Sequence, residues 1–279
     1  MKKFLIACLL VLVTFPAVAE DAKESAFDRV MRTGVLKCGY YVFPPVTYRD
    51  PNAKELSGFS IDMMNAIAKR ASLKIEWTEE VTFGNWAPAL QSRRFDAVCT
   101  PMFPGASTAK GAAFTVPFLY SGLSPMVRAD DERFKDNDLA RLNKPDVTFI
   151  MQDGGDFLST TPDVFPQAKI HNVMAGVDGP TMLQDIVTKK ADAILMDRNG
   201  EIAYNKNNPV KLRLVDPAHP VKLQSFTLAV GRGEWALKDF LDTAIDEMNN
   251  DGSIDRMMKK WESESGQFLR VAKPYEPAK

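Results

Sequence analysis

Aromatic side chains gather at the ends of two expected strands in the first half of the chain. Tyr40, Tyr41 and Phe43 follow the apolar run VLKC, Phe103 follows the run FDAVC, and Trp86 lies between the two runs. The face of an aromatic ring attracts a cation by roughly 0.5 to 2 kcal/mol. A single ring of this kind is more often part of a core. Several rings at the carboxyl ends of strands, where open α/β sheets bind ligands, indicate a binding site.

The motifs of several enzyme classes are missing. The chain has no GxSxG nucleophile elbow, no phosphate-binding P-loop and no HExxH zinc motif, and its GxG at 231–233 lacks the rest of a dinucleotide fingerprint. His171 and His219 lie far apart and form no ligand cluster with the cysteines, so we expect no metal site and no cofactor, and we place both histidines in loops. These absences favour a binding protein over an enzyme.

The first nineteen residues have the pattern of a cleavable secretory signal. Lys2 and Lys3 are followed by an apolar run to Phe15 and then by the small residues Ala17 and Ala19. The run is shorter than the about 20 residues that a membrane span needs. We therefore expect cleavage after Ala19 and export to the periplasm, and no later segment is apolar enough to cross a membrane.

The charge balance argues against a nucleic-acid-binding protein. The chain of 279 residues has 35 Lys and Arg against 36 Asp and Glu, and removal of the signal with its two lysines leaves 33 basic side chains. The mature chain then has a net charge of about −3 and no basic footprint for nucleic acid. It is long enough for one large domain or for two domains of ordinary size.

Two cysteines, Cys38 and Cys99, remain after processing, in a compartment that permits disulfides. Each of them ends a short apolar run, VLKC or DAVC, and is therefore expected at the end of a strand. If the two strands are neighbours, a disulfide can join them. Two separate buried thiols are the alternative.

Strand, helix and strand alternate in two parts of the chain. In the first part, a strand at 35–41 is followed by a helix that Ser60 caps, a strand at 74–78, a short helix and the strand FDAVC. In the second part, VTFIMQ, a helix at 180–188, ADAILMD and a helix over EIAYNKN follow one another. The alternation is typical of α/β lobes with parallel strands. The charged segment ADDERFKDNDLARLNKP separates the two parts, and two final helices are expected to break at Asp251 and Gly252.

Five segments occur in an order and spacing that resemble the family 3 periplasmic solute-binding proteins of ABC importers. They are GFSIDMMNAIAKRA, WAPALQSRRFDAVCTPM, FTVPFLYSG, ADAILMDRNGEIAY and MNNDGSIDRMMKKW. The resemblance covers nearly all of the mature chain. It implies an α/β Venus-flytrap fold of type II, in which two crossover segments join two lobes and the ligand binds between them. Ligand binding then shifts an equilibrium between open and closed forms.

The resemblance also implies how the chain is divided. Lobe one takes residues 20–122, lobe two takes 123–220, and residues 221–279 return to lobe one. The chain is expected to cross near Ser121 to Ser124 and to return near Val221. The expected partners are a small-molecule ligand and an ABC permease of the inner membrane, which recognises the closed form. The protein itself is expected to be a monomer.

The amino-acid binders of this family hold the ligand's α-carboxylate with a hydroxyl and an arginine that this chain lacks. An ungapped count from Asp96 puts the hydroxyl position on Phe103 and the arginine position on Thr108. Lys110 aligns with an outward, solvated position. In the second lobe the family's GT turn reads GGD, so Asp156 brings a carboxylate to a helix terminus that would otherwise attract an anion.

The acidic residue that holds the ligand's ammonium in these relatives is matched by Asp197, at the end of ADAILMD. A loop acid or a helix cap is the alternative for Asp197, and an N-cap is the alternative for Asp156. Phe83 aligns with the family's ring-stacking aromatic. The expected ligand-binding residues are therefore Tyr40, Tyr41, Phe43, Phe83, Trp86, Phe103, Thr108, Asp156 and Asp197.

These departures from the family pattern favour a small cationic or amine-bearing ligand. An arginine–carboxylate contact contributes about 1.5 to 3 kcal/mol per charged bond, and a buried unpaired carboxylate costs several more, so an amino acid in the usual pose is disfavoured. The alternatives are a neutral polar ligand and an amino acid held in another orientation. Two further classes stay open: an enzyme like the cyclohexadienyl dehydratases, with Asp156 as the acid, and a periplasmic partner of a quinoprotein dehydrogenase.

Overall fold

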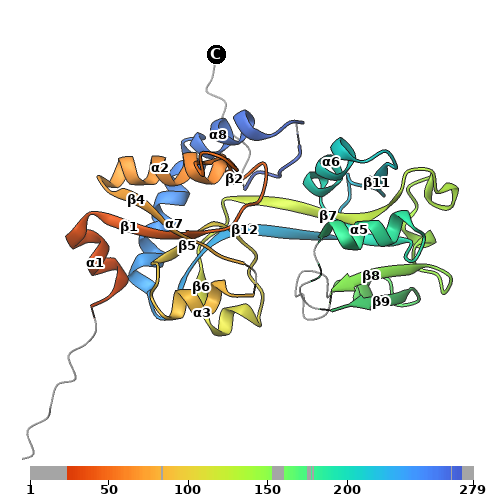
Figure 1. The fold of residues 1–279 in the computed structure, drawn as a ribbon, viewed down its shortest axis with the longest axis horizontal. Coiled ribbons are helices and arrows are strands. Elements are labelled where there is room, and N and C mark those ends of the chain that lie inside the picture. Colours follow the sequence, from red (N-terminus) through yellow and green to blue (C-terminus); the bar gives the residue numbers. More distant parts are fainter. Residues whose placement is uncertain are drawn as a thin grey trace, which may run out of the picture.

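The computed structural model describes residues 24–82, 84–152, 160–174, 177, 179–264 and 266–271. It has two α/β lobes, and two long strands, β7 (Leu119–Arg128) and β12 (Lys222–Gly231), run from one lobe to the other (Figure 1). The predicted two-lobed α/β fold with two crossover segments is confirmed.

Lobe one contains the elements before β7 and the two helices after β12. In chain order these are α1 (Ala26–Thr33), β1 (Val35–Tyr40), β2 (Tyr48–Arg49), β3 (Leu56–Ser57), α2 (Phe59–Ala71), β4 (Lys74–Glu80), α3 (Trp86–Gln91), β5 (Ala97–Met102), η1 (Thr108–Lys110), β6 (Ala112–Phe114), α7 (Trp235–Asn250) and α8 (Ser253–Trp261).

Lobe two contains the elements between β7 and β12. In chain order these are η2 (Glu132–Phe134), η3 (Leu139–Arg141), β8 (Thr148–Gln152), α4 (Thr160–Val164), β9 (Lys169–Val173), α5 (Gly179–Val187), β10 (Ala193–Met196), α6 (Arg198–Asn207) and β11 (Leu212–Leu214).

One path of hydrogen-bonded strands runs through both lobes, in the order β4-β1-β5-β12-β7-β10-β8-β9. Strand β1 is parallel to β4 and β5, so the carboxyl ends of β1 and β5 lie at the same edge of lobe one. Strand β12 is antiparallel to both β5 and β7, with Lys222 opposite Leu123 and Phe226 opposite Leu119. The predicted lobe boundaries, at 122–123 and 220–221, lie on or beside the pair of crossover strands and stay predictions.

Helix α2 shows how the sequence builds the core of lobe one. Its large, fully buried apolar residues are Phe59, Met63, Met64 and Ile67. They fall on one face of the helix, as a helical period requires. The helix begins after Gly58, so the prediction that Ser60 caps it is wrong. A Cβ at Gly58 would lie 2.5 Å from the Val46 carbonyl oxygen, and its φ is +124°, so this turn requires glycine.

Cys38 in β1 and Cys99 in β5 are joined by a disulfide, with their Cα atoms 5.4 Å apart. The two strands are neighbours in the sheet, where Cys38 lies opposite Ala97. Of the two possibilities that the sequence leaves open, the structure has the bridge. Both cysteines are fully buried in the core of lobe one.

The charged segment at 129–145, which separates the two sets of elements along the sequence, holds η2 and η3 at the end of lobe two that faces away from lobe one (Figure 1). It follows β7, which has already entered lobe two. One local prediction differs from the structure. His171 is in the edge strand β9 instead of a loop, 3.8 Å from the Asp185 carboxylate. His219 does lie outside the helices and strands, beside Asp216.

The chain ends as predicted in two helices, which break at Asp251 and Gly252, where Gly252 adopts a φ of 73°. In the part of the chain that the structure describes, no helix combines the length and apolar character of a membrane span. The predicted signal segment, 1–19, lies outside that part.

Candidate functional site

Three of the predicted aromatic residues come together where β1 and β5 end. Tyr41 and Phe43 follow β1, and Phe103 follows β5. The ring centroid of Phe43 lies 6.0 Å from that of Tyr41 and 6.1 Å from that of Phe103. Phe226 of the crossover strand β12 lies 5.3 Å from Phe103. Tyr41, Phe43, Phe103 and Phe226 form an aromatic wall that joins the strand ends of lobe one to a crossover strand.

The four rings of this wall differ in exposure. Tyr41 and Phe226 are buried, whereas Phe43 and Phe103 are half-buried. The Tyr41 hydroxyl donates to the Pro101 carbonyl oxygen, and burial raises the pKa of this phenol, which therefore stays neutral. The partly exposed ring surface of the wall thus belongs to Phe43 and Phe103.

Tyr40 and Trp86 lie apart from the wall. The Tyr40 ring packs edge-on against Trp77 of β4, with centroids 6.0 Å apart. Trp86 shares a buried cluster with Tyr41, but its ring packs edge-on against Phe114. Both Tyr40 and Trp86 are buried, and their roles as ligand contacts stay predictions.

Thr108 lies in the short turn η1, where its hydroxyl forms local hydrogen bonds. The hydroxyl donates to the Gly105 carbonyl oxygen at 3.0 Å and accepts from the Gly105 N–H at 3.1 Å. Thr108 therefore stabilises its own turn, and its predicted contact with the ligand stays a prediction. Phe83 and Asp156 lie outside the described residues, so their predicted roles stay predictions as well.

Asp197 caps helix α6 at the point where lobe two meets the crossover strand β7. One carboxylate oxygen accepts from the Gly200 N–H at 2.8 Å, and the other accepts from the Ser121 hydroxyl at 2.7 Å. Asp197 is only 8% exposed. No Lys or Arg among the described residues contributes a charge to it, and burial raises its pKa above the ordinary value for aspartate.

The structure therefore confirms the alternative interpretation of Asp197, which is that it caps a helix. A ligand contact for the same side chain stays a prediction, and the two roles are compatible. An ionised carboxylate has about four acceptor positions, whereas Ser121 and Gly200 use one each.

A second polar contact joins the lobes beside Asp197. The side-chain amide of Asn199 donates to the Pro44 carbonyl oxygen at 2.8 Å, in the loop that follows Phe43. The contact holds the Phe43 loop of lobe one next to the first turn of α6. The sequence did not indicate Ser121 or Asn199 as site residues, because their partners are 76 and 155 residues away along the chain. Their position in FLYSG and MDRNG, two segments that carry the family resemblance, could have indicated these residues.

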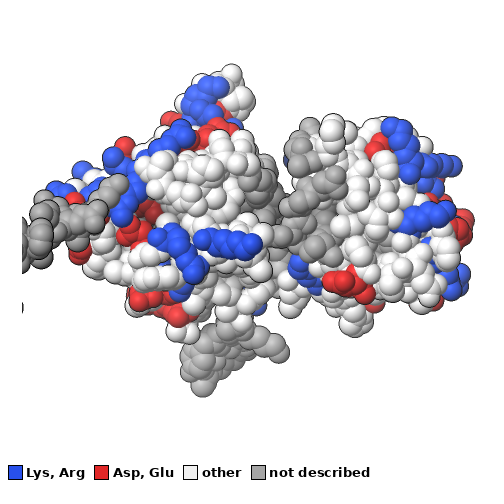
Figure 2. Space-filling model, turned by 90° about the horizontal axis from the view of Figure 1, so that it is seen from below, with Lys and Arg blue, Asp and Glu red and all other residues white. Residues whose placement is uncertain are grey.

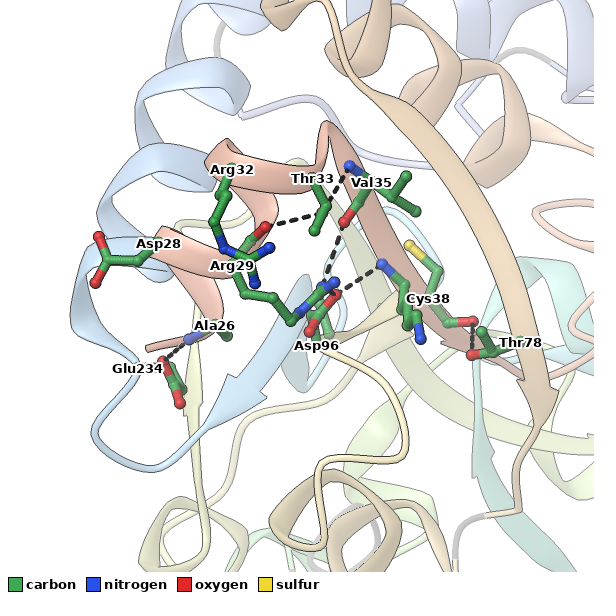
Figure 3. Close-up of polar contacts among 12 residues, drawn as sticks. Ala26, Asp28, Arg29, Arg32, Thr33, Val35, Cys38, Thr78, Asp96 and Glu234 are labelled. Atoms are coloured by element: carbon green, nitrogen blue, oxygen red, sulfur yellow. Dashed lines mark hydrogen bonds and ion pairs between the residues drawn. The ribbon is translucent and has the colours of Figure 1, made fainter. Parts of the chain in front are cut away.

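A hollow of about 410 Å³ lies at the opposite end of the lobe-one sheet, beside the amino-terminal end of β1. Its acidic side chains already have partners (Figure 3): Asp96 pairs with Arg29, and Glu234 accepts from the Ala26 N–H. Glu234 also pairs with Arg93 at 2.8 Å. Because these groups satisfy one another, we interpret the hollow as a structural part of lobe one and not as the ligand site.

Within the described ranges, no group of three or more His, Cys, Asp or Glu is placed to hold a metal ion. On the face shown in Figure 2, basic and acidic side chains are interspersed over both lobes. This face therefore offers no continuous basic surface to a polyanion.

Comparison with known proteins finds a matching family model and several relatives that cover most of the chain. The model of the family described as bacterial extracellular solute-binding proteins, family 3, matches residues 36–264. The chain is similar to a cyclohexadienyl dehydratase of Pseudomonas aeruginosa, with 25% identity over 263 residues that cover 93% of this chain and 94% of the relative. It is also similar to the L-cystine-binding protein TcyJ of Escherichia coli, with 24% identity over 254 residues that cover 90% and 91%.

Among solved structures, the chain resembles an ancestral amino acid-binding protein that is described as a precursor of cyclohexadienyl dehydratase. The TM-score is 0.67 at 27% identity, and the match covers 85% of this chain and 99% of the other. Most of the similar proteins carry the names of amino-acid-binding proteins. The resemblance inferred from the five sequence segments is confirmed.

Proposed function

Because the chain belongs to the bacterial extracellular solute-binding proteins of family 3, we propose that it is the periplasmic substrate-binding component of an ABC importer. It is exported after cleavage behind Ala19, acts as a monomer, and captures a small cationic or amine-bearing solute between its lobes. The permease then recognises the closed form, and no reaction is catalysed.

The buried carboxylate of Asp197 is the observation that supports this choice of ligand. Its partners in the structure, the Ser121 hydroxyl and the Gly200 N–H, are both neutral. Burial of a carboxylate without a positive partner is unfavourable, and the pKa of Asp197 is accordingly raised. A bound ammonium would supply the missing charge in a site that excludes water. A cation therefore gains more from this position than a neutral solute does.

The segment around Thr108 offers little to a carboxylate. Thr108 stands where the amino-acid binders of the family have an arginine, and its hydroxyl is already used within its own turn. An amino acid in the usual pose would lose about 1.5 to 3 kcal/mol for each charged bond that the arginine provides. An amino acid held in another orientation is the alternative ligand.

A thermal-shift screen of the mature protein, residues 20–279, tests the proposal. The compounds are amino acids, polyamines, betaines, choline-like compounds and small sugars. A ligand that binds only the folded protein stabilises it by about 2.7 kcal/mol at a hundredfold excess over its Kd. We expect amines or quaternary ammonium compounds to raise the Tm. If only ordinary α-amino acids raised the Tm, the α-carboxylate of the ligand would have another binding partner in the protein, and this result would contradict the proposal.

The affinity for a cationic ligand is expected to fall when the pH is lowered through the raised pKa of Asp197. The ligand-free protein holds this carboxyl with a pKa above its ordinary value, whereas a cation favours the ionised form. Binding therefore releases a proton in this range, and each pH unit below the pKa reduces the affinity by up to about tenfold. Titration calorimetry between about pH 4 and about pH 8 measures the effect. An affinity that does not change over this range would count against Asp197 as the charge partner.

Dehydratase activity is the second candidate, and the 25% identity to a cyclohexadienyl dehydratase over 93% of this chain favours it. Such an enzyme needs an acid that protonates a leaving hydroxyl. The sequence offers Asp156 for this step, which lies outside the described residues, and among the described carboxyls Asp197, with its raised pKa, also suits it. The anionic substrate counts against it, because Thr108 offers no positive charge. Incubation with prephenate separates the two candidates. Turnover would replace the binding proposal, whereas no turnover together with an amine-induced rise in Tm would support it.

A further inference from the structure

The side chain of Asn199 ties three chain segments together between the lobes. Its amide N–H donates to the Pro44 carbonyl oxygen at 2.8 Å, and its oxygen accepts from the side-chain amide of Gln267 at 2.9 Å. Asn199 is 6% exposed and Gln267 is 4% exposed, so their mutual contact is buried, whereas the contact with Pro44 is partly buried. Asn199 belongs to α6 of lobe two, whereas both partners belong to lobe one.

The segment that carries Gln267 is fixed to lobe one and to the crossover. The side-chain oxygen of Gln267 accepts from the Ser263 N–H at 2.8 Å and from the Ser263 hydroxyl at 3.1 Å. Two residues further on, the backbone of Leu269 exchanges two hydrogen bonds of 2.8 Å with Tyr120 on β7. The contacts with Ser263 before Gln267 and with Tyr120 after it therefore fix the position from which Gln267 donates to Asn199.

These contacts lie beside the strands about which the lobes turn. Tyr120 and Ser121 belong to the part of β7 that pairs with β12 between the lobes, and Ser121 donates to Asp197. When one lobe rotates against the other, each point moves in proportion to its distance from the hinge, so contacts at the hinge change least. The contacts of Asn199 are therefore in a place where they can persist in the open and closed forms.

We propose that Asn199 is a positioning residue that pins the first turn of α6 to lobe one throughout opening and closing. Asp197 from lobe two and Phe43 from lobe one then keep their relative positions, and the charged group of the ligand finds its partner before the lobes close. The rest of lobe two then closes over a ligand that Asp197 and Phe43 already contact. The inference rests on the proposed function for the closure of the lobes and for the role of Asp197 as the charge partner of the ligand.

The test compares Asn199→Ala with the wild type. The substitution removes both contacts that Asn199 makes with lobe one without adding a charge, and it leaves the neighbouring Arg198–Glu264 ion pair in place. We expect the ligand-free variant to show a broader distribution of distances between the lobes. Its affinity for a ligand should fall about fivefold to tenfold, which is in the range of one net hydrogen bond. Spin labels at Lys69→Cys on α2 and Gln184→Cys on α5, both exposed positions, report the distances by double electron–electron resonance. The native Cys38 and Cys99 are bridged and do not take up label.

Asn205→Ala is the matched control. Asn205 is a second asparagine of α6, and its side-chain amide also both donates and accepts a hydrogen bond. It donates to the Leu212 carbonyl oxygen at 2.7 Å and accepts from the Leu212 N–H at 2.9 Å, within lobe two. The control loses the same kinds of hydrogen bond but none between the lobes. We expect its Tm to fall while the distance distribution and the affinity stay at the wild-type values.

Gln267→Ala removes the second partner and covers the case in which Asn199→Ala does not fold. If Asn199 and Gln267 act through their mutual contact, the double variant should lose less than the sum of the single variants. An unchanged distance distribution and affinity in Asn199→Ala would overturn the proposal. A higher affinity would overturn it too, because the contacts would then hold the open form and break on closure. If the wild type binds no cation, the proposed function fails, while the distances in the ligand-free variants still test the role of Asn199.

Discussion

Asp197→Asn is expected to weaken the binding of a cationic ligand by about 100-fold or more and to leave the ligand-free protein at least as stable as the wild type. The loss arises because the ligand's positive charge would be buried without its partner, which costs about 3 kcal/mol or more. The substitution keeps the size of the side chain and one oxygen. Titration calorimetry with the best amine from the thermal-shift screen measures the change in Kd.

The stability of this variant follows from the pKa of Asp197. Because the folded-state pKa is raised above the ordinary value, the wild type gains stability as the pH falls through that pKa and the buried carboxylate takes up a proton. Above that pKa, the wild type buries an uncompensated charge that the variant lacks. Asparagine is as good an N-cap as aspartate, and its oxygen can still accept from the Gly200 N–H or the Ser121 hydroxyl. The variant should therefore equal or exceed the wild type in stability at neutral pH, with a difference that shrinks as the pH falls.

Asp138→Asn is the control for this experiment. Asp138 is also an N-cap in lobe two and accepts from the Ala140 N–H at 2.9 Å, but its side chain is 53% exposed. The control changes the net charge of the lobe by the same amount, so its ligand affinity should stay at the wild-type value. If Asp197→Asn bound a cationic ligand as well as the wild type, the assignment of Asp197 would be wrong. The same result with a neutral ligand would be expected.

Replacement of both Cys38 and Cys99 by alanine is expected to lower the free energy of unfolding by about 4 kcal/mol. The disulfide closes a loop with a sequence separation of 61 residues, and loop closure restricts the unfolded chain. For a loop of this length the chain-entropy model gives the value stated above. Native strain and residual structure in the unfolded chain can reduce it. Urea unfolding of the mature protein, followed by circular dichroism, measures the difference in free energy.

Reduction provides the control for the disulfide. Since both cysteines are fully buried, a thiol reagent reaches them only when lobe one opens. Unfolding of the wild type in the presence of reductant should approach that of the double variant, and reductant should leave the double variant unchanged. A double variant within about 1 kcal/mol of the wild type would contradict the prediction, because natural disulfides in exported proteins typically contribute about 2 to 5 kcal/mol.

The elements of each lobe could be predicted because their signals are local. The helical face of α2 and the break between α7 and α8 follow from the spacing of apolar residues and from Gly252. The pairing of β12 with β7 could not be read from the run KLQSFTLAVG, because a strand does not encode its distant neighbour. The resemblance to a family supplied the crossover. The charged segment at 129–145 separates the two sets of elements along the sequence, but its charge indicates only exposure to water and not which lobe it covers.

The sequence could predict at which strand ends the candidate site lies, but not how each side chain there is oriented. The rule that ligands bind at the carboxyl ends of strands located Tyr41, Phe43 and Phe103, which the structure brings together. It could not show that Tyr40 turns toward Trp77, because packing partners decide the direction of a ring. The contact of Asp197 with Ser121 depends on the way the chain crosses between the lobes, and no local pattern contains that information.

The strands β7 and β12 run side by side between the lobes, so lobe two is an insertion whose two ends are neighbours. Leu123 of β7 and Lys222 of β12, which flank the elements of lobe two, lie opposite each other in the sheet. An insert whose two ends adjoin can be replaced without a change in the register of the sheet that remains. Recombination between relatives could therefore bring a different lobe two, including the residue at position 197, onto an unaltered lobe one. The disulfide and most of the aromatic wall lie outside lobe two and would be unchanged in each such recombinant.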